Sequence, residues 1–533
     1  MRTDVKRRGW TISAEGNDLA DRFLESVFFT GNGRMGARGY PAYRPIRRPL
    51  DAGLFLAGFY DRISDSTELT DFVNLPTPIW YQIRLNGRIP AIPSHLSRAL
   101  DLRTGLLTFR YRLSIADDWV DVQEQRFFSL AKPSFLFQRL EFQGRGQGEL
   151  LAGMDHQSCN SPIPDDQVKE NTQIIQMTRF CSGEATDAGF TARYKTNHTR
   201  LELAQTVSCR TEGFSSPAFV ADTGDGVGVR CTSDASDAPI ALEIAARLTS
   251  SRDVDPLLQL DVEPGWDFVS ALAENQAAWE QKWADCDIVM EGDDDAQTAL
   301  RYVIYQLAAN CSPRDHTVSI GARGLTHTRY KGCYFWDTDL FLTPFYDLTD
   351  PKAARSLAGF RVGTLPQARA HAARMNGAGA RYPWMVSYDG TEQCESWDIG
   401  CSEVHVTADV AYALGQYLDW TGDDRLFFQG GAQVLVETAR FWVSRYSPAP
   451  EAGKVNLLFC KGPDEYCGIT SNNLFTNAMV KHNLSLALTA AARLKKEAPE
   501  QYAALSLSKA ECAAWEILRD AIQLPRDPIT GHY

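Results

Sequence analysis

The spacing of apolar residues changes once along this 533-residue chain, and no other feature limits its fold as much. Before about residue 264, apolar and polar residues alternate, as in residues 107–113 (Leu-Thr-Phe-Arg-Tyr-Arg-Leu), which is the pattern of a half-buried β-strand. From Asp293 onward, Leu300, Val303 and Leu307 recur at helical spacing. The sequence therefore predicts a β-rich region followed by a helical region, in a protein of more than one domain.

The β-rich region carries turn signals between its predicted strands, at residues 86–87 (Asn-Gly) and 117–118 (Asp-Asp). Short alternating strands joined by such turns favour antiparallel sheets packed face to face. We therefore expect an N-terminal β-sandwich over residues 1–262. Residues 263–292 contain a tryptophan-rich helical stretch, which predicts a linker helix that docks the first domain on the second.

The second half of the chain predicts helices separated by long loops rich in aromatic and charged residues. The predicted helices after the one that begins near Asp293 lie at about residues 351–376, 407–421, 424–446, 473–496 and 500–523. Successive helices with chemistry in the loops suit a helical toroid over residues 293–533. A closed double ring of helix pairs needs about twelve helices, so about half a ring is predicted here.

Composition excludes several classes of function. The net charge is −13, which argues against a nucleic-acid partner or an anionic membrane surface. There is no run of 18 apolar residues and no apolar segment after the basic start, so neither a membrane span nor a signal peptide is expected. The 12 cysteines are scattered, without zinc-like spacing, which predicts no metal site and free thiols in a reducing cytoplasm.

A glycine-rich stretch at residues 31–39 (Gly-Asn-Gly-Arg-Met-Gly-Ala-Arg-Gly) has two interpretations. It could cradle a phosphate, but no Gly-Lys-Ser/Thr follows, and no strand leads a glycine motif into a helix. A loop that needs glycine for its own shape is the favoured interpretation.

The strongest candidate for catalysis is the turn at residues 461–466 (Lys-Gly-Pro-Asp-Glu-Tyr), between two predicted helices. A turn at a helix start can hold a carboxylic acid partly away from water, which keeps it protonated near neutral pH. Glu465 is therefore a candidate general acid. By spacing alone, the preferred interpretation is that Asp464 and Glu465 are only acids at a helix start.

Two further loops hold candidate sugar-binding residues. Trp336 and Asp337 pair a stacking surface with a hydroxyl acceptor, although a single Trp-Asp pair is a weak signal. Residues 379–384 (Gly-Ala-Arg-Tyr-Pro-Trp) end in Trp384, and several acids follow. His405, before a predicted helix, fits an ordinary packed or capping histidine.

Taken in order, these segments resemble glycoside hydrolase family 65, the inverting phosphorylases of α-glucosides such as maltose, trehalose and kojibiose, with a few hydrolases. The matching blocks cover nearly the whole chain. They are residues 31–39, the Ala-Arg-Gly-Leu-Thr and Phe-Trp-Asp-Thr segments within 322–338, residues 379–384, residues 462–466, and the asparagines at 472–473 and 477.

The resemblance implies a β-sandwich, a helical linker and an (α/α)6 barrel, with Glu465 as general acid. Trp336 and Asp337 would hold the glucose that is cleaved, and Trp384 would help to line the sugar pocket. The implied reaction is inverting phosphorolysis of an α-linked glucosyl disaccharide or oligosaccharide to β-glucose 1-phosphate, with inorganic phosphate as co-substrate and no cofactor or metal. Asp464 would help to raise the pKa of Glu465.

Two alternatives stay open: an inverting α-glucoside hydrolase of the same fold, and a non-catalytic sugar-binding relative. By the resemblance, Tyr533 lies in the middle of the barrel, and the segment expected to separate phosphorylase from hydrolase lies beyond it. Cys467 stands where many members have His, at a position that could contact a sugar. Residues 385–389 (Met-Val-Ser-Tyr-Asp) stand where some members have Glu-Ser-Ala-Asp, and this loop difference leaves the acceptor sugar open. Dimers are common in the family, but no pattern in this sequence argues for one.

Overall fold

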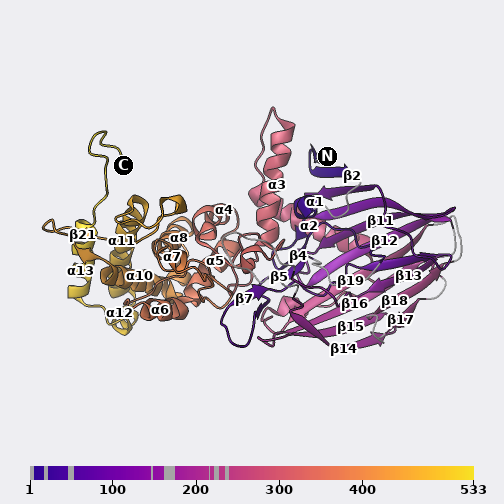
Figure 1. Ribbon diagram of the computed structural model, residues 1–533, viewed down its shortest axis with the longest axis horizontal. Coiled ribbons are helices and arrows are strands. Elements are labelled where there is room, and N and C mark those ends of the chain that lie inside the picture. The colour runs from indigo at the N-terminus through magenta and orange to yellow at the C-terminus, as the bar shows by residue number, and fades with distance from the viewer. Residues whose placement is uncertain are drawn as a thin grey trace. The chain divides into compact units, whose positions relative to one another are not determined.

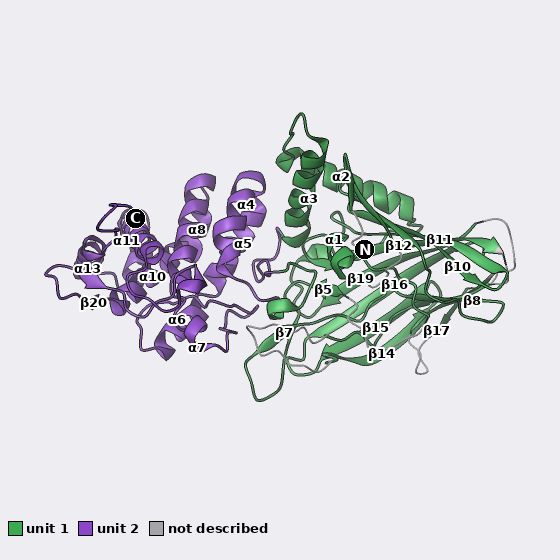
Figure 2. Cartoon of the chain, turned by 45° about the horizontal axis from the view of Figure 1, so that its top comes forward, with its two compact units in different colours: residues 1–164, 170–312, 323–331 green, residues 165–169, 313–322, 332–533 purple. Residues whose placement is uncertain are grey.

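The computed structural model describes residues 5–16, 22–45, 53–145, 148–160, 175–214, 217–220, 227–233 and 239–533. These residues form two compact units (Figures 1 and 2). The first contains the described residues up to Ser312 together with Arg323–Lys331, and the second contains Pro313–Ala322 and Gly332–Tyr533. Strands dominate the first unit and helices the second, as the change in apolar spacing predicts.

A ten-stranded antiparallel sheet dominates the first unit. Its strands, in spatial order, are β1 (Lys6–Arg8), β2 (Thr11–Gly16), β9 (Leu96–Asp101), β10 (Leu106–Ile115), β11 (Asp118–Phe128), β12 (Phe135–Arg145), β19 (Ile240–Ser250), β16 (Glu202–Glu212), β15 (Gly189–Thr196) and β14 (Thr178–Thr186). In β10 the predicted alternation is confirmed, because Leu107, Phe109 and Leu113 are buried while Arg110 and Arg112 are exposed. The turn predicted at residues 86–87 is present, and the turn predicted at 117–118 lies one residue earlier, at 116–117.

A second sheet packs on the first through aromatic side chains. Its strands are β17 (Ala218–Val220), β18 (Gly228–Ser233), β13 (Gly148–Gly153) and β8 (Tyr81–Leu85). The hydroxyl of Tyr81 on β8 lies 2.5 Å from that of Tyr111 on β10. Its ring packs against Phe142 on β12 with 5.5 Å between centroids. Apolar surface from both sheets is thereby removed from water.

Shorter elements complete the strand-rich part. They are α1 (Arg22–Val27), β3 (Thr30–Gly31), β4 (Met35–Ala37), β5 (Leu54–Leu56), β6 (Tyr60–Arg62), β7 (Thr70–Phe72) and the 3-10 helices η1 (Pro256–Gln259) and η2 (Arg329–Gly332).

The glycine-rich loop is packed within the first unit. Gly33 has φ +84°, and a Cβ there would lie 2.1 Å from the carbonyl oxygen of Cys311. The Asn32 amide donates to the carbonyls of Ser129 and Pro133 at 2.7 and 3.0 Å. Glycine is therefore required for backbone conformation and close approach, which supports the structural interpretation of this loop.

Two longer helices belong to the first unit: α2 (Phe268–Cys286) and α3 (Asp294–Asn310). Each begins at an aspartate whose side chain accepts backbone amide hydrogen bonds, Asp267 for α2 and Asp293 for α3. The buried ring of Trp279 on α2 stacks on that of Tyr305 on α3, with centroids 5.1 Å apart.

The second unit is helical. Its elements are the π-helix η3 (Thr338–Leu342), α4 (Thr343–Thr349), α5 (Pro351–Gly363), α6 (Leu365–Arg374), α7 (Trp397–Gly400), α8 (Val406–Thr421), α9 (Asp424–Leu426), the π-helix η4 (Phe427–Gly431), α10 (Ala432–Arg445), β20 (Ser447–Pro448), β21 (Val455–Asn456), the 3-10 helix η5 (Glu465–Cys467), α11 (Leu474–Glu497), α12 (Pro499–Ala504) and α13 (Lys509–Ala521). No helix in the described ranges is long and apolar enough to cross a membrane.

The core of the helical unit lies where α8, α10, α11 and α13 meet. Trp442 and Trp515 are fully buried there. The indole N–H of Trp442 donates to the side-chain oxygen of Asn483 at 2.9 Å, and the Asn483 amide donates to Thr438 at 3.0 Å. These hydrogen bonds satisfy polar groups that would be costly to bury unpaired.

Candidate active site

The turn that carries Glu465 is held on both sides by backbone contacts. Cys460 and Thr470 exchange hydrogen bonds at 2.9 and 2.8 Å, and the Lys461 amide donates to the carbonyl of Ser402 at 3.0 Å. A Cβ on Gly462 would lie 2.3 Å from the side-chain nitrogen of Asn473, so this position needs glycine unless its neighbour moves. The backbone around Glu465 is therefore fixed by its surroundings.

Glu465 is half-buried at the start of η5, and its pKa lies above the ordinary value. Burial is the main cause, and the negative charge of Glu403 is the next. The positive charges of Lys461 and His405 oppose the rise, while Asp337 adds to it. These charges and the partial burial hold a proton on Glu465 to higher pH than in water.

Asp464, expected to raise this pKa, has another role in the structure. Its carboxylate accepts the backbone amide of Tyr466 at 3.1 Å and so caps the short helix η5. The carboxylates that raise the pKa of Glu465 are instead Glu403 and Asp337, which come from distant parts of the sequence.

Two of the charges that act on Glu465 belong to a buried row of three titratable side chains, Glu403, His405 and Asp409. The imidazole Nε2 of His405 lies 2.9 Å from Glu403 Oε2, and its Nδ1 lies 2.6 Å from Asp409 Oδ2. All three side chains are at most 1% exposed. Burial alone would lower the pKa of His405, but the two carboxylates outweigh it and raise this pKa to about 9. His405 is therefore a cation that donates to both carboxylates at neutral pH.

A buried ion pair lies beside this row. Arg361 donates Nε to Asp339 Oδ1 at 3.0 Å and Nη2 to Oδ2 at 2.5 Å, a two-point contact. The Tyr382 hydroxyl donates to the Arg361 carbonyl at 2.6 Å. Burial raises the pKa of Asp409 to about 6, and the charges of His405 and Arg361 limit that rise.

Trp336 covers one side of His405. The two rings meet edge to face, with centroids 4.9 Å apart and planes at 85°. Phe475 at the start of α11 contacts both rings, at 6.2 Å from Trp336 and 5.8 Å from His405. Asp337 follows at the start of η3, and its pKa is raised by partial burial and by the charge of Asp339.

Trp384 lies on a neighbouring loop. Its ring meets Phe335 edge to face at 5.0 Å, and its amide donates to Glu392 at 2.9 Å. The Glu392 carboxylate accepts four backbone amides in all, from residues 384, 385, 393 and 394. The described contacts thus link Trp384 to the chain neighbour of Trp336 rather than to Glu465 itself.

The arrangement therefore brings together Glu465, Asp337 and Trp336 around His405. A partly buried acid with a raised pKa suits proton donation to a leaving group. An indole beside a carboxylate suits a sugar ring, because the ring stacks while hydroxyls bond to the acid. Sequence reasoning did not assign roles to Glu403, Asp409, Asp339 or Arg361. The available signal was the His-x-x-x-Asp spacing of 405 and 409 on one helix face.

Comparisons with known proteins match both units. The N-terminal domain of glycosyl hydrolase family 65 matches residues 15–282, and the central catalytic domain of the same family matches residues 301–531. A solved structure described as a candidate kojibiose phosphorylase from the human microbiome matches with a TM-score of 0.86 and 19% identity, over 99% of this chain and 72% of that one. That structural match shows a shared fold.

Several curated relatives are phosphorylases. A kojibiose phosphorylase of Caldanaerobacter subterraneus subsp. tengcongensis is 29% identical over 97% of this chain and 71% of its own length. An α,α-trehalose phosphorylase of Thermoanaerobacter brockii is 37% identical over 46% of this chain and 32% of its own length. A 1,2-α-glucosylglycerol phosphorylase of Bacillus selenitireducens is 27% identical over 98% of this chain and 69% of its own length. With both family domains matched along the chain, this protein belongs to glycosyl hydrolase family 65.

Proposed function

We propose that this protein is an inverting α-glucoside phosphorylase, which transfers a glucosyl group from an α-linked disaccharide to inorganic phosphate. The observation that carries the proposal is the partly buried Glu465, whose pKa is raised by burial and by the charges of Glu403 and Asp337. Trp336 packs against His405, whose charge also acts on Glu465. The names of the relatives support the same reaction class, with kojibiose, trehalose and glucosylglycerol as their substrates. The helical unit would form part of an (α/α)6 barrel.

In the proposed reaction, Glu465 donates its proton to the glycosidic oxygen. Inorganic phosphate attacks the anomeric carbon from the opposite face, the C–O bond breaks, and the products are β-glucose 1-phosphate and the acceptor sugar. Trp336 would stack on the glucose ring and Asp337 would accept its hydroxyls, with Trp384 lining the pocket. Phosphate takes the place of water, so no second carboxylate is needed as a base.

The buried row of Glu403, His405 and Asp409 has a defined role in this proposal. Within this row, the negative charge of Glu403 raises the pKa of Glu465 more than the positive charge of His405 lowers it, so the row acts on Glu465 as a net negative charge. That charge favours the protonated form of Glu465 before the sugar binds. Because the row is shielded from water, its field changes little when substrate displaces solvent.

The test is phosphate dependence. The protein is incubated with kojibiose, trehalose or maltose, with and without inorganic phosphate, and ³¹P NMR is used to identify β-glucose 1-phosphate. We expect sugar phosphate only with phosphate present and with one or more of these substrates. Equal release of glucose in both incubations would refute the phosphorylase and indicate the hydrolase.

A matched pair of variants tests the role of Glu465. Glu465→Gln should lower turnover by about 10²–10⁴-fold, the usual contribution of a general acid, while sugar binding remains. Asp464→Asn changes the adjacent acid but keeps an acceptor for the helix cap, so its turnover should stay close to that of the wild type. Equal losses in the two variants would contradict the assignment.

A further inference from the structure

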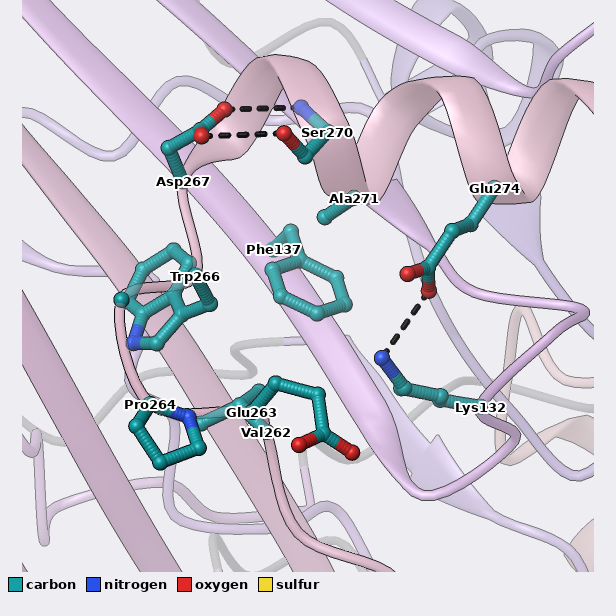
Figure 3. A pocket seen from close by; sticks show the side chains of 11 residues that line it. Lys132, Phe137, Val262, Glu263, Pro264, Trp266, Asp267, Ser270, Ala271 and Glu274 are labelled. Carbon is teal, nitrogen blue, oxygen red and sulfur yellow. Dashed lines mark hydrogen bonds and ion pairs between the residues drawn. The ribbon is translucent and has the colours of Figure 1, made fainter.

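A pocket of about 200 Å³ lies in the first unit. It opens between β12 and the segment that leads into α2 (Figure 3). The residues that line it and bear on its chemistry are Lys132, Phe137, Glu263, Trp266, Asp267 and Glu274. Its volume suits one small ring rather than a drug-sized ligand, which usually occupies about 300–1,000 Å³.

The wall of this pocket is fixed before any ligand binds. Gly265 has φ +82°, which lets the chain turn sharply ahead of α2. Arg210 donates to the carbonyl of Gly265 at 3.0 Å and also to that of Trp266. Asp267 then caps α2 by accepting the backbone amide and the hydroxyl of Ser270, at 2.7 and 2.9 Å. Trp266 is therefore carried by a backbone held on both sides.

The pocket combines an aromatic wall with a polar rim. Trp266 and Phe137 lie together with 5.8 Å between ring centroids, and Phe137 belongs to the apolar core beneath. Figure 3 shows the Lys132–Glu274 ion pair, 2.9 Å long, across the pocket from Trp266. That pair uses one of the three Lys132 donors, and the second Glu274 carboxylate oxygen has no hydrogen-bond partner among the described residues. Glu263 forms no hydrogen bond or ion pair with another described residue.

We propose that this pocket is an accessory site for a neutral saccharide, which binds one hexose ring outside the helical unit. The C–H face of the ring stacks on Trp266. A hydroxyl both donates and accepts, so neighbouring hydroxyls can donate to Glu263 and accept from Lys132, as hydrogen bonds strengthened by charge.

Charge and polarity argue against other occupants. An anion would meet three carboxylates, Glu263, Asp267 and Glu274, against one ammonium group. A purely apolar ligand would strip water from Glu263 and Lys132 without replacing their hydrogen bonds. A cationic ligand would be drawn to Glu263 and repelled by Lys132, which makes it the competing case for experiment.

The test separates this pocket from the proposed active site. Saturation-transfer NMR is recorded with millimolar glucose and kojibiose on the Trp336→Ala protein, which lacks the stacking surface of the active site. We expect the transfer to persist, and to fall at least fivefold when Trp266→Ala is added. Trp420→Ala, which removes a half-exposed tryptophan of α8, is the matched control and should leave the transfer unchanged.

A second variant guards against misfolding of the first. Glu263→Ala with Lys132→Met alters only the rim, and it should reduce transfer by a similar factor. The proposal is overturned if the Trp336→Ala protein shows no saturation transfer to the sugar. It is also overturned if the transfer is unchanged both in Trp266→Ala and in the double variant Glu263→Ala with Lys132→Met. Displacement of bound sugar by arginine amide at equal concentration would assign the pocket to a cation instead. None of these outcomes depends on whether the protein phosphorolyses a disaccharide.

Discussion

The buried cation at His405 makes the stability of the helical unit depend on pH in a defined range. Its pKa is about 9 in the folded protein against 6.5 for an ordinary histidine. That difference, about 2.5 pH units at about 1.4 kcal/mol each, corresponds to about 3 kcal/mol of unfolding free energy. Because the folded pKa is the higher one, this stabilisation is complete below about pH 6.5 and is lost as the pH rises through about 9.

Asp409→Asn should remove much of this pH dependence. Asparagine keeps the shape and can still accept a hydrogen bond, but it supplies no negative charge, so only Glu403 remains to hold the proton on His405. We expect the loss of stability between pH 6.5 and 9 to shrink by at least about half. Asp409 itself has a pKa of about 6, so its own titration falls mainly below this range.

The assay is hydrogen exchange of peptides from α8, measured at several pH values and corrected for intrinsic exchange rates. Asp347→Asn is the control, because Asp347 is a buried acid whose partner is Gln416 rather than a histidine. The Asp347→Asn protein should show the same loss of protection between pH 6.5 and 9 as the wild type. The reasoning would be refuted if protection of the α8 peptides fell equally with pH in the wild type and in Asp409→Asn. Histidine ¹⁵N shifts that show neutral His405 at pH 8 would refute it as well.

Three further substitutions test single contacts. Lys461→Met removes a cation that lowers the pKa of Glu465. The alkaline limb of the pH profile of kcat/KM should therefore move to higher pH, and a shift to lower pH would contradict this. Trp442→Phe leaves the side-chain oxygen of Asn483 without its indole donor and should cost about 1–3 kcal/mol, read as a lower Tm. Gly33→Ala, at φ +84° against a backbone carbonyl, should cost at least about 1–3 kcal/mol in the same assay, and an unchanged Tm would show that the loop relaxes.

The longer helices were predictable in place, but their number and their interruptions were not. The pattern over residues 351–376 predicts one helix, whereas α5 ends at Gly363 and α6 begins at Leu365. Pro366 has no amide to bond the preceding turn, which explains the break. Likewise, the predicted helix at 424–446 is divided by the π-helix η4, where Gly430 adopts φ +125°. Apolar periodicity reports which face is buried, and it does not register one residue that changes the backbone.

The candidate site was predictable only where it is local. The turn before Glu465 is visible because glycine, proline and two acids stand together. His405 was interpreted as a packed or capping residue, and it is buried, but its ring bonds two carboxylates and makes no cap hydrogen bond. That role depends on burial and on the charges of Glu403 and Asp409. The state of Asp409 depends in turn on Arg361, more than 40 residues away, which spacing cannot report. For the same reason Asp464 was assigned the influence that Glu403 exerts.

The order of strands in the large sheet has a consequence for biosynthesis. β19 pairs with β12 on one side and with β16 on the other, and so joins two meanders made earlier, β9 to β12 and β14 to β16. Until the ribosome has released residues 240–250, both meanders present an unpaired edge, and that of β12 carries Phe135, Phe137 and Leu140. Such edges invite pairing between nascent chains. Slow translation just before this segment should therefore lower the yield of native protein, and a chaperone that covers strand edges should restore it.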